Sequence, residues 1–240
     1  MAMSDEVLSL RTLGWRWPGA TEPVFDGVNM ALKAGEHVLL QGESGCGKST
    51  LLALAAGVRV AGPGQVSLLG QDWHALPSVQ RDRRRADHIG CIFQQFNLLP
   101  YLSVLDNVLL PCHFSTVRAQ RAGASAAQRQ ARAQALLEAL QLAPALWARS
   151  AAQLSVGQQQ RVAAARAFLG APELVLADEP TSALDEARRD QFMALLLTVC
   201  REAGSALLLV SHDSRLAVHC HRTVRWSALQ SGAVPSLGGT

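Results

Sequence analysis

One short stretch limits the possible folds of this chain more than any other. The run Gly42-Glu43-Ser44-Gly45-Cys46-Gly47-Lys48-Ser49 matches the pattern G-x-x-x-x-G-K-[ST] in full. It follows an apolar run over His37–Gln41, which predicts a strand, and it precedes a segment that predicts a helix beginning near Lys48. Glycines let consecutive backbone N–H groups turn toward one anion, and the helix N-terminus adds partial positive charge. The stretch therefore predicts a strand, a phosphate-binding loop and a helix within an α/β fold.

The residue types of this loop suit separate tasks around a nucleotide. Lys48 is expected to reach the β- and γ-phosphates, and the Ser49 hydroxyl is expected to ligate Mg²⁺. Cys46 is predicted to be a small filler and not a nucleophile. The motif by itself does not separate kinases, GTPases, motors and transport ATPases. The predicted nucleotide-binding residues of the loop are Gly42, Glu43, Ser44, Gly45, Cys46, Gly47, Lys48, Ser49 and Thr50.

A pair of carboxylates follows a second apolar run. Leu174–Ala177 predicts a buried strand, and Asp178 and Glu179 come directly after it. Ligands of open α/β sheets lie at the carboxyl ends of the strands. Asp178 is therefore placed to hold the magnesium shell, and Glu179 is placed to polarise a water for in-line attack on a γ-phosphate. The pair predicts nucleotide hydrolysis.

Composition and charge exclude several classes of protein. The 22 Lys and Arg residues against 19 Asp and Glu residues give a net charge of only +3, which makes no case for a nucleic-acid partner. No apolar run approaches the roughly 18 residues needed to cross a bilayer. The N-terminus carries acids where a signal peptide is basic. The five cysteines form no Cys-x-x-Cys pair, so a reducing cytoplasm fits best.

The rest of the pattern indicates one domain with a parallel sheet. With 240 residues, 49% of them hydrophobic, the chain is long and apolar enough to bury a sizeable core. Residues 103–141 predict a helical insertion. Strands with continuous apolar runs between helices indicate a parallel sheet covered on both faces. The other predicted strands are Val7–Leu13, Val28–Leu32, Gln65–Leu69, Ile89–Phe93 and Ala206–Val210, and the other predicted helices are Gly157–Gly170 and Glu186–Ala203.

A third stretch carries a family resemblance. Leu154-Ser155-Val156-Gly157-Gln158-Gln159-Gln160-Arg161 resembles the L-S-G-G-Q signature, followed by Q-Q-R, of the ATP-binding cassette (ABC) ATPases. In that family two copies close around two ATP molecules, and the signature of one copy contacts the nucleotide of the other. Read from the residues, Ser155 predicts a helix N-cap, and Gly157 leaves a backbone N–H open to a phosphate. The third residue departs from the pattern, since valine at position 156 adds bulk beside that nucleotide.

Further matches extend the resemblance over nearly the whole chain. Gln94 resembles the glutamine that contacts magnesium and the attacking water, and His212 resembles the histidine that contacts the γ-phosphate. Residues 182–185, ending in Asp185, resemble the segment used for contact between subunits. Trp17, before Pro18-Gly19, resembles the aromatic residue that stacks on adenine, and it is preferred to Trp15. The resemblance adds Ser155, Gly157, Gln158, Asp185 and Trp17 to the residues expected to bind ATP.

The resemblance implies a fold and a division of the chain. The expected fold is that of a P-loop NTPase with a RecA-like parallel-sheet core, an antiparallel β subdomain and a helical subdomain. Residues 1–240 form a single ABC ATPase domain. The core and β subdomain are expected over about 1–93 and 172–228, and the helical subdomain with the signature over about 94–171.

The segment after Gln94 narrows the family and suggests a partner. Residues 94–100, 104–108 and 110–111 resemble the macrolide-export and lipoprotein-release subfamily of bacterial ABC ATPases. The resemblance implies a homodimer on the inner face of the cell membrane, which contacts the membrane only through an integral permease subunit. Phe96, Leu98 and Leu99 are expected to anchor a helix of that partner, and Leu105 and Val108 are expected in the core. Two alternatives stay open, the ATPase of a small-solute importer and a soluble cassette protein.

Overall fold

A five-stranded sheet of parallel strands stands at the centre of the computed structural model, which describes residues 5–182 and 184–230. Its register pairs Gln41 with Ser211 and Asp178 with Val210. The carboxyl ends of β3 (His37–Gln41), β7 (Leu174–Asp178) and β8 (Ala206–Ser211) therefore meet at one edge of the sheet, where the phosphate loop and the carboxylate pair follow. The strands lie in the order β6 (Ile89–Ile92), β7 (Leu174–Asp178), β8 (Ala206–Ser211), β3 (His37–Gln41) and β9 (Arg222–Arg225).

A second, antiparallel sheet covers one side of the first. It contains β2 (Phe25–Lys33), β1 (Glu6–Trp15), β4 (Val66–Leu68) and β5 (Gln71–Asp72) in that order. Side chains alternate along the central strands, because successive strand residues point to opposite faces. In β8, Leu208 packs toward the antiparallel sheet, and Leu207 and Leu209 pack toward the helices on the other face. Two hydrophobic cores, one on each face, result.

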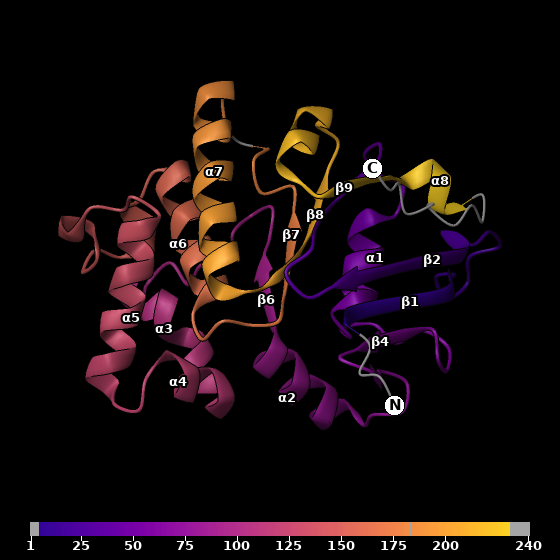
Figure 1. The fold of residues 1–240 in the computed structure, drawn as a ribbon, viewed down its shortest axis with the longest axis horizontal. Helices are drawn as coiled ribbons and strands as arrows, with labels where there is room; N and C mark the ends of the chain where they lie inside the picture. Colours follow the sequence, from indigo (N-terminus) through magenta and orange to yellow (C-terminus); the bar gives the residue numbers. More distant parts are fainter. Residues whose placement is uncertain (1–4, 183, 231–240) are drawn as a thin grey trace.

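Helices cover the remaining surface of the central sheet. Figure 1 shows α3 (Val104–Phe114), α4 (Thr116–Ala122), α5 (Ala126–Ala139) and α6 (Val156–Phe168) gathered on the side of the sheet that lies away from β1 and β2. No helix among the described residues is both long and apolar enough to span a bilayer. The helices are α1 (Lys48–Ala55), α2 (Ser78–His88), α3 (Val104–Phe114), α4 (Thr116–Ala122), α5 (Ala126–Ala139), α6 (Val156–Phe168), α7 (Glu186–Ala203) and α8 (Trp226–Gln230), with 3-10 turns at Pro144–Leu146, Ala151–Gln153 and Ser214–His219.

Most predicted elements are confirmed, with shifts at their ends. The strand His37–Gln41 and the helix Glu186–Ala203 have the predicted bounds. The helical insertion predicted over residues 103–141 consists of α3, α4 and α5. Its helices begin at serine N-caps, each of which accepts a hydrogen bond from a backbone N–H in the first turn. Helices α2 and α8 and the strand β9 were not predicted.

One buried contact fixes the helical part of the chain onto the sheet. The Arg118 guanidinium, in α4, donates to the backbone carbonyls of Ile89, Ala167 and Leu169 at 3.3, 2.6 and 2.7 Å. Burial lowers the pKa of Arg118 to about 10. At Gly90, in β6, an added Cβ would stand 2.3 Å from the Ala167 carbonyl oxygen, so only glycine fits. The end of α6 is thereby pressed against β6, the strand that leads to Gln94.

Candidate nucleotide site

The loop after β3 has the backbone that an anion site needs. Gly45 and Gly47 have φ angles of 80° and 111°, which favour glycine. At Gly47 an added Cβ would also stand 2.6 Å from a methyl carbon of Val24. Gly47 caps α1 without a side-chain hydrogen bond, so the first N–H groups of that helix face the loop. The fold thus places these N–H groups and the start of α1 around the concave side of the loop.

Lys48 points back into the loop that it closes. Its side chain is buried, and its ammonium donates to the carbonyl oxygen of Gly42 at 2.8 Å and to that of Glu43. The Cys46 sulfur lies 3.9 Å from the same nitrogen. The Lys48 ammonium is thus held at the loop by neutral carbonyl oxygens. Because it has three protons to donate, it is able to exchange these carbonyls for phosphate oxygens.

A cavity of about 310 Å³ joins this loop to the carboxylate pair. It brings together predicted residues from four separate parts of the sequence, which the fold places at the same edge of the sheet. Ser182, which the sequence assigned only to the subunit-contact segment, also lines it. The lining residues are Ser44, Gly45, Gly47, Lys48, Ser49, Thr50, Gln94, Asp178, Glu179, Ser182 and His212.

Asp178 lies at the end of β7, next to the start of α1. Burial raises its pKa, and the neighbouring Glu179 charge acts in the same direction. A hydrogen bond from Ser49 and the charge of Lys48 partly oppose this rise. Asp178 and Ser49 are therefore in contact, and both line the cavity.

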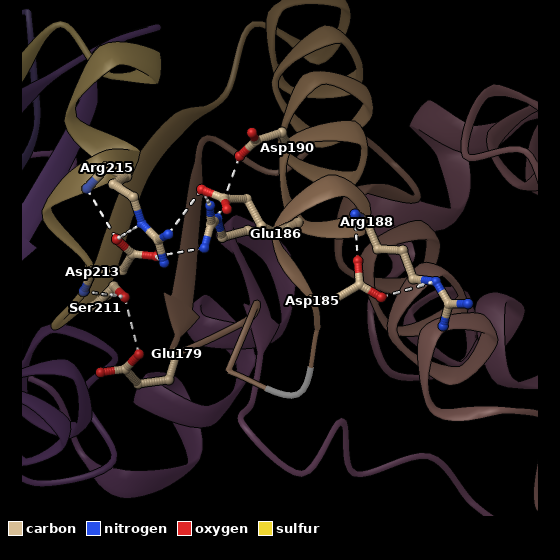
Figure 2. A network of polar contacts seen from close by, with 9 residues as sticks. Glu179, Asp185, Glu186, Arg188, Asp190, Ser211, Asp213 and Arg215 are labelled. Carbon is tan, nitrogen blue, oxygen red and sulfur yellow. Dashed lines mark hydrogen bonds and ion pairs between the residues drawn. The ribbon is translucent and has the colours of Figure 1, made fainter.

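Glu179 has a strained backbone and a tightly held side chain. Its φ is 46°, in the left-handed region that few residues other than glycine adopt. One carboxylate oxygen accepts from the backbone N–H of His212 at 3.1 Å and lies 2.9 Å from the ring Nδ1 of the same residue. The other oxygen accepts from the Ser211 hydroxyl at 3.0 Å, as Figure 2 shows. Sequence reasoning found Glu179 and His212 but missed Ser211, because no motif marks it.

The signature residues lie away from the cavity. Ser155 caps α6, and Gln158 completes a capping box by accepting from the Ser155 N–H at 2.9 Å. Val156 is half exposed, and an added Cβ on Gly157 would meet only a Leu184 methyl at 3.8 Å. The start of α6 is therefore open, and the same chain's phosphate loop does not reach it. The predicted N-cap is confirmed.

A buried glutamine connects the signature helix to the carboxylate pair. Gln160 is 1% exposed, and its amide nitrogen donates to the carbonyl oxygen of Pro180, the residue after Glu179. Its amide oxygen has no hydrogen-bond partner among the described residues. Sequence reasoning quoted this residue only as part of the signature. Its hydrogen bond joins residues that are far apart in the sequence, so the spacing of the motif residues gave no indication of it.

Besides the signature residues, the predicted residues Asp185 and Trp17 lie outside the cavity lining, and so do Gly42, Glu43 and Cys46 of the phosphate loop. Asp185 caps α7 and pairs with Arg188 at 3.3 Å, and the Ala183 position of the same segment lies outside the described residues. Trp17 is 38% exposed, stands edge-on to Trp15 with ring centroids 6.0 Å apart, and has the Arg59 guanidinium 4.2 Å from its centroid. The cavity lining does not include either tryptophan.

A larger groove of about 910 Å³ opens beside the cavity and shares Ser49 and Asp178 with it. Three exposed apolar side chains line it, those of Val58, Phe93 and Phe114. The charged side chains that line it are two aspartates and four arginines, namely Asp82, Asp178, Arg83, Arg85, Arg118 and Arg166. The groove is therefore apolar with a basic excess.

The predicted anchors do not line this groove. Phe96 is buried with a φ of 59°, because Arg166 donates to the carbonyl oxygens of Phe96 and Asn97 at 2.6 and 2.7 Å and holds this turn inward. The prediction of Phe96 as an anchor is wrong. Leu98 packs against the helical core, and neither it nor Leu99 is among the groove residues. Val108 is buried, as expected, and Leu105 is half-buried against the same core.

Comparison with known proteins agrees with this geometry. The sequence profile of the family described as "ABC transporter" matches residues 25–182, which hold the phosphate loop, the signature stretch and the carboxylate pair. The chain belongs to the ABC transporter family. It is an ATPase cassette of that family, and the predicted resemblance is confirmed.

Two members of the ABC transporter family illustrate the similarity. The chain is 46% identical over 202 residues to "Uncharacterized ABC transporter ATP-binding protein YbbA" of Escherichia coli K12, which covers 84% of this chain and 85% of the relative. It is 42% identical over 225 residues to "Lipoprotein-releasing system ATP-binding protein LolD" of Novosphingobium aromaticivorans, with 93% and 97% covered. The expected likeness to lipoprotein-release cassettes is confirmed.

A solved structure supports the fold assignment. The dimeric post-hydrolysis state of the ATP-binding cassette MJ0796, bound to ADP and Pi, matches with a TM-score of 0.82 and 34% identity. The match covers 97% of this chain and 100% of that one. The P-loop fold predicted from the sequence is confirmed.

Proposed function

We propose that two copies of this chain close around two ATP molecules and drive a membrane protein complex of the lipoprotein-release or export type. The separation of two sites on one chain carries this proposal. The cavity holds the phosphate loop, Asp178, Glu179 and His212, whereas the open start of α6 lies elsewhere. A second copy, arranged as an isologous dimer, brings each signature to the other copy's cavity. The dimeric state of MJ0796 supports this arrangement.

Within each cavity, we assign roles by position. Lys48 and the loop N–H groups bind the phosphates, and Ser155, Gly157, Gln158 and Asp185 belong to the contact with the other copy's nucleotide. Glu179 is the general base that takes a proton from the attacking water. His212 and Gln94 complete the catalytic set, His212 by contact with the γ-phosphate and Gln94 by orienting water. Trp17 is proposed to stack on adenine, which requires Arg59 to leave one face of its ring.

The donor set near the loop fits Mg²⁺. The Ser49 hydroxyl, the Asp178 carboxylate and the Gln94 amide all face one cavity, and hard oxygen ligands of this kind suit that ion. Among the described residues no group of three His, Cys, Asp or Glu side chains is able to hold a metal alone. The ion would therefore share its shell with phosphate oxygens. When bound, it neutralises charge that develops on those oxygens.

The groove is proposed to receive a short helix from an integral membrane subunit. Val58, Phe93 and Phe114 offer apolar contact, and Arg83 and Arg85 both line the groove. This combination fits an amphipathic helix that carries an acidic residue. Docking there places the cassette on the cytoplasmic face of the inner membrane. We also propose the division of the chain into a core over about 1–93 and 172–228 and a helical subdomain over about 94–171, and residues of both parts line the groove.

Co-purification tests this assignment. The chain carrying an affinity tag is added to detergent-solubilised membranes of its own source, and retained integral membrane proteins are identified by mass spectrometry. Phe114→Glu should lose the membrane subunit, because burying an unpaired carboxylate in an apolar contact costs several kcal/mol. Val79→Glu is the matched control, because Val79 is 76% exposed and lies outside the groove lining. Both variants should bind ATP normally.

The outcomes separate the candidate functions. An integral membrane protein retained by the wild type and by Val79→Glu, and lost from Phe114→Glu, supports the proposal. A membrane protein recovered together with a solute-binding protein supports the importer instead. Retention by Phe114→Glu places the partner surface elsewhere, and the absence of any membrane protein favours a soluble cassette.

A further inference from the structure

A cluster of charged side chains joins the first turn of α7 to the loop after β8. Arg189 is 5% exposed, and its guanidinium lies 2.9 Å from Asp213, 3.3 Å from Glu186 and 3.3 Å from Asp190. Figure 2 shows these carboxylates around the base of α7, with Ser211 and Glu179 directly beyond Asp213. A cation that is nearly buried and has three anionic neighbours is fixed in place.

Arg215 adds a second cation to the same cluster. It donates to both oxygens of Asp213 at 2.9 Å and contacts Glu186 at 2.9 Å. The hydrogen bond from Arg215 lowers the pKa of Asp213 to about 2, and the charge of Arg189 adds to this effect. Asp213 is therefore ionised at neutral pH and bound to both arginines.

Asp213 is connected to the catalytic carboxylate through one hydroxyl. The Asp213 backbone N–H donates to the Ser211 Oγ at 3.1 Å, and that hydroxyl lies 3.0 Å from a carboxylate oxygen of Glu179. Because a carboxylate only accepts hydrogen bonds, the Ser211 hydroxyl is the donor in this contact, while its Oγ accepts from Asp213. Ser211 is 1% exposed, so water does not replace this contact.

We propose that Ser211 is a positioning residue for the Glu179 carboxylate, and that the Arg189–Asp213 pair ties it to the start of α7. The inference rests on the proposed role of Glu179 as general base. His212 fixes one oxygen and Ser211 fixes the other. Helix α7 begins directly after the segment expected to contact the second copy. Closure of the dimer therefore affects the position of the Glu179 carboxylate through Arg189, Asp213 and Ser211.

The test measures single-turnover hydrolysis and ATP affinity on the full chain. Ser211→Ala should lower the hydrolysis rate by about 10- to 100-fold, because a hydrogen bond to a charged group is lost, and should leave the Kd for ATP unchanged. Ser211→Thr keeps the hydroxyl and should recover most of the rate. Ser205→Ala is the matched control: Ser205 is buried at the other end of β8, and its hydroxyl donates to the Pro172 carbonyl at 2.6 Å. It should hydrolyse ATP at the wild-type rate.

Double variants decide whether Ser211 acts through Glu179. In a Glu179→Gln background, Ser211→Ala should cause no further loss of rate, because the group that it positions is gone. Asp213→Asn should lower the rate several-fold and should not add to Ser211→Ala. A wild-type rate for Ser211→Ala, or an equal loss in both backgrounds, overturns the proposal. A wild-type rate for Glu179→Gln alone instead refutes the proposed general base. If Ser211→Ala does not fold, Asp213→Asn in the two backgrounds gives the same decision.

Discussion

Replacing Gly157 with Ala should affect folding and activity in opposite directions. Gly157 is the second residue of α6, and an added Cβ would meet only a Leu184 methyl at 3.8 Å, which is ordinary contact. Alanine is preferred to glycine within helices by up to about 1 kcal/mol. The free energy of unfolding should therefore stay constant or rise by up to about 1 kcal/mol.

The same methyl group should reduce ATP turnover. It would stand beside the backbone N–H groups at the start of α6, where the phosphate of the second copy's nucleotide is proposed to dock. Losing one hydrogen bond to a charged group costs about 1.5–3 kcal/mol. Turnover should accordingly fall by about 10- to 100-fold. ATP affinity of the isolated chain should not change, since the phosphate loop lies elsewhere.

Urea unfolding and steady-state turnover of the same preparation test both effects. Val156→Ala is the control, because Val156 lies in the same turn with a half-exposed side chain: it leaves Gly157 intact and removes bulk beside the proposed nucleotide contact, so it should not lower turnover. Wild-type turnover by Gly157→Ala would show that the start of α6 contacts no nucleotide. A loss of stability above about 1 kcal/mol would show that the space around Gly157 is not open.

Three further changes have defined outcomes. Lys48→Ala should abolish measurable ATP binding in a titration, since no other Lys or Arg lines the cavity within the described part of the chain, and an unaltered Kd would refute its role. Trp17→Ala should weaken ATP binding by about 1–3 kcal/mol if the indole stacks on adenine. Burial, with the charges of His221 and Arg201, lowers the pKa of His37 to about 4. The unfolded chain therefore binds more protons below about pH 6.5, so stability should fall from there to about pH 4, by at most about 1.4 kcal/mol per pH unit. His37→Gln should flatten this slope in pH-dependent unfolding.

Local patterns in the sequence were enough to predict the centre of the site. The phosphate loop depends on glycines between a strand and a helix, and the carboxylate pair depends on an apolar strand directly before Asp178. The phosphate loop and the carboxylate pair are each encoded by consecutive residues. Parallel pairing then brings them together without further information, because their strands end at the same edge of the sheet.

Features that depend on tertiary contacts were not predictable in this way. Helix α2 has only Asp87 buried, so it lacks the apolar stripe that marks a helix. Phe96 looked like a surface anchor, but Arg166, seventy positions along the chain, turns its backbone inward. Ser211 carries no motif of its own, and its importance follows from a carboxylate that arrives from another strand.

The state of the Glu179→Gln variant in the presence of ATP tests the central claim most directly. The amide fills the same space but does not accept the proton of the attacking water, so ATP should remain bound between two copies. Light scattering after size-exclusion chromatography should then give about twice the monomer mass of 25.6 kDa with ATP and the monomer mass with ADP. A monomer in ATP, or hydrolysis at the wild-type rate, would contradict the proposed dimer and its catalytic base.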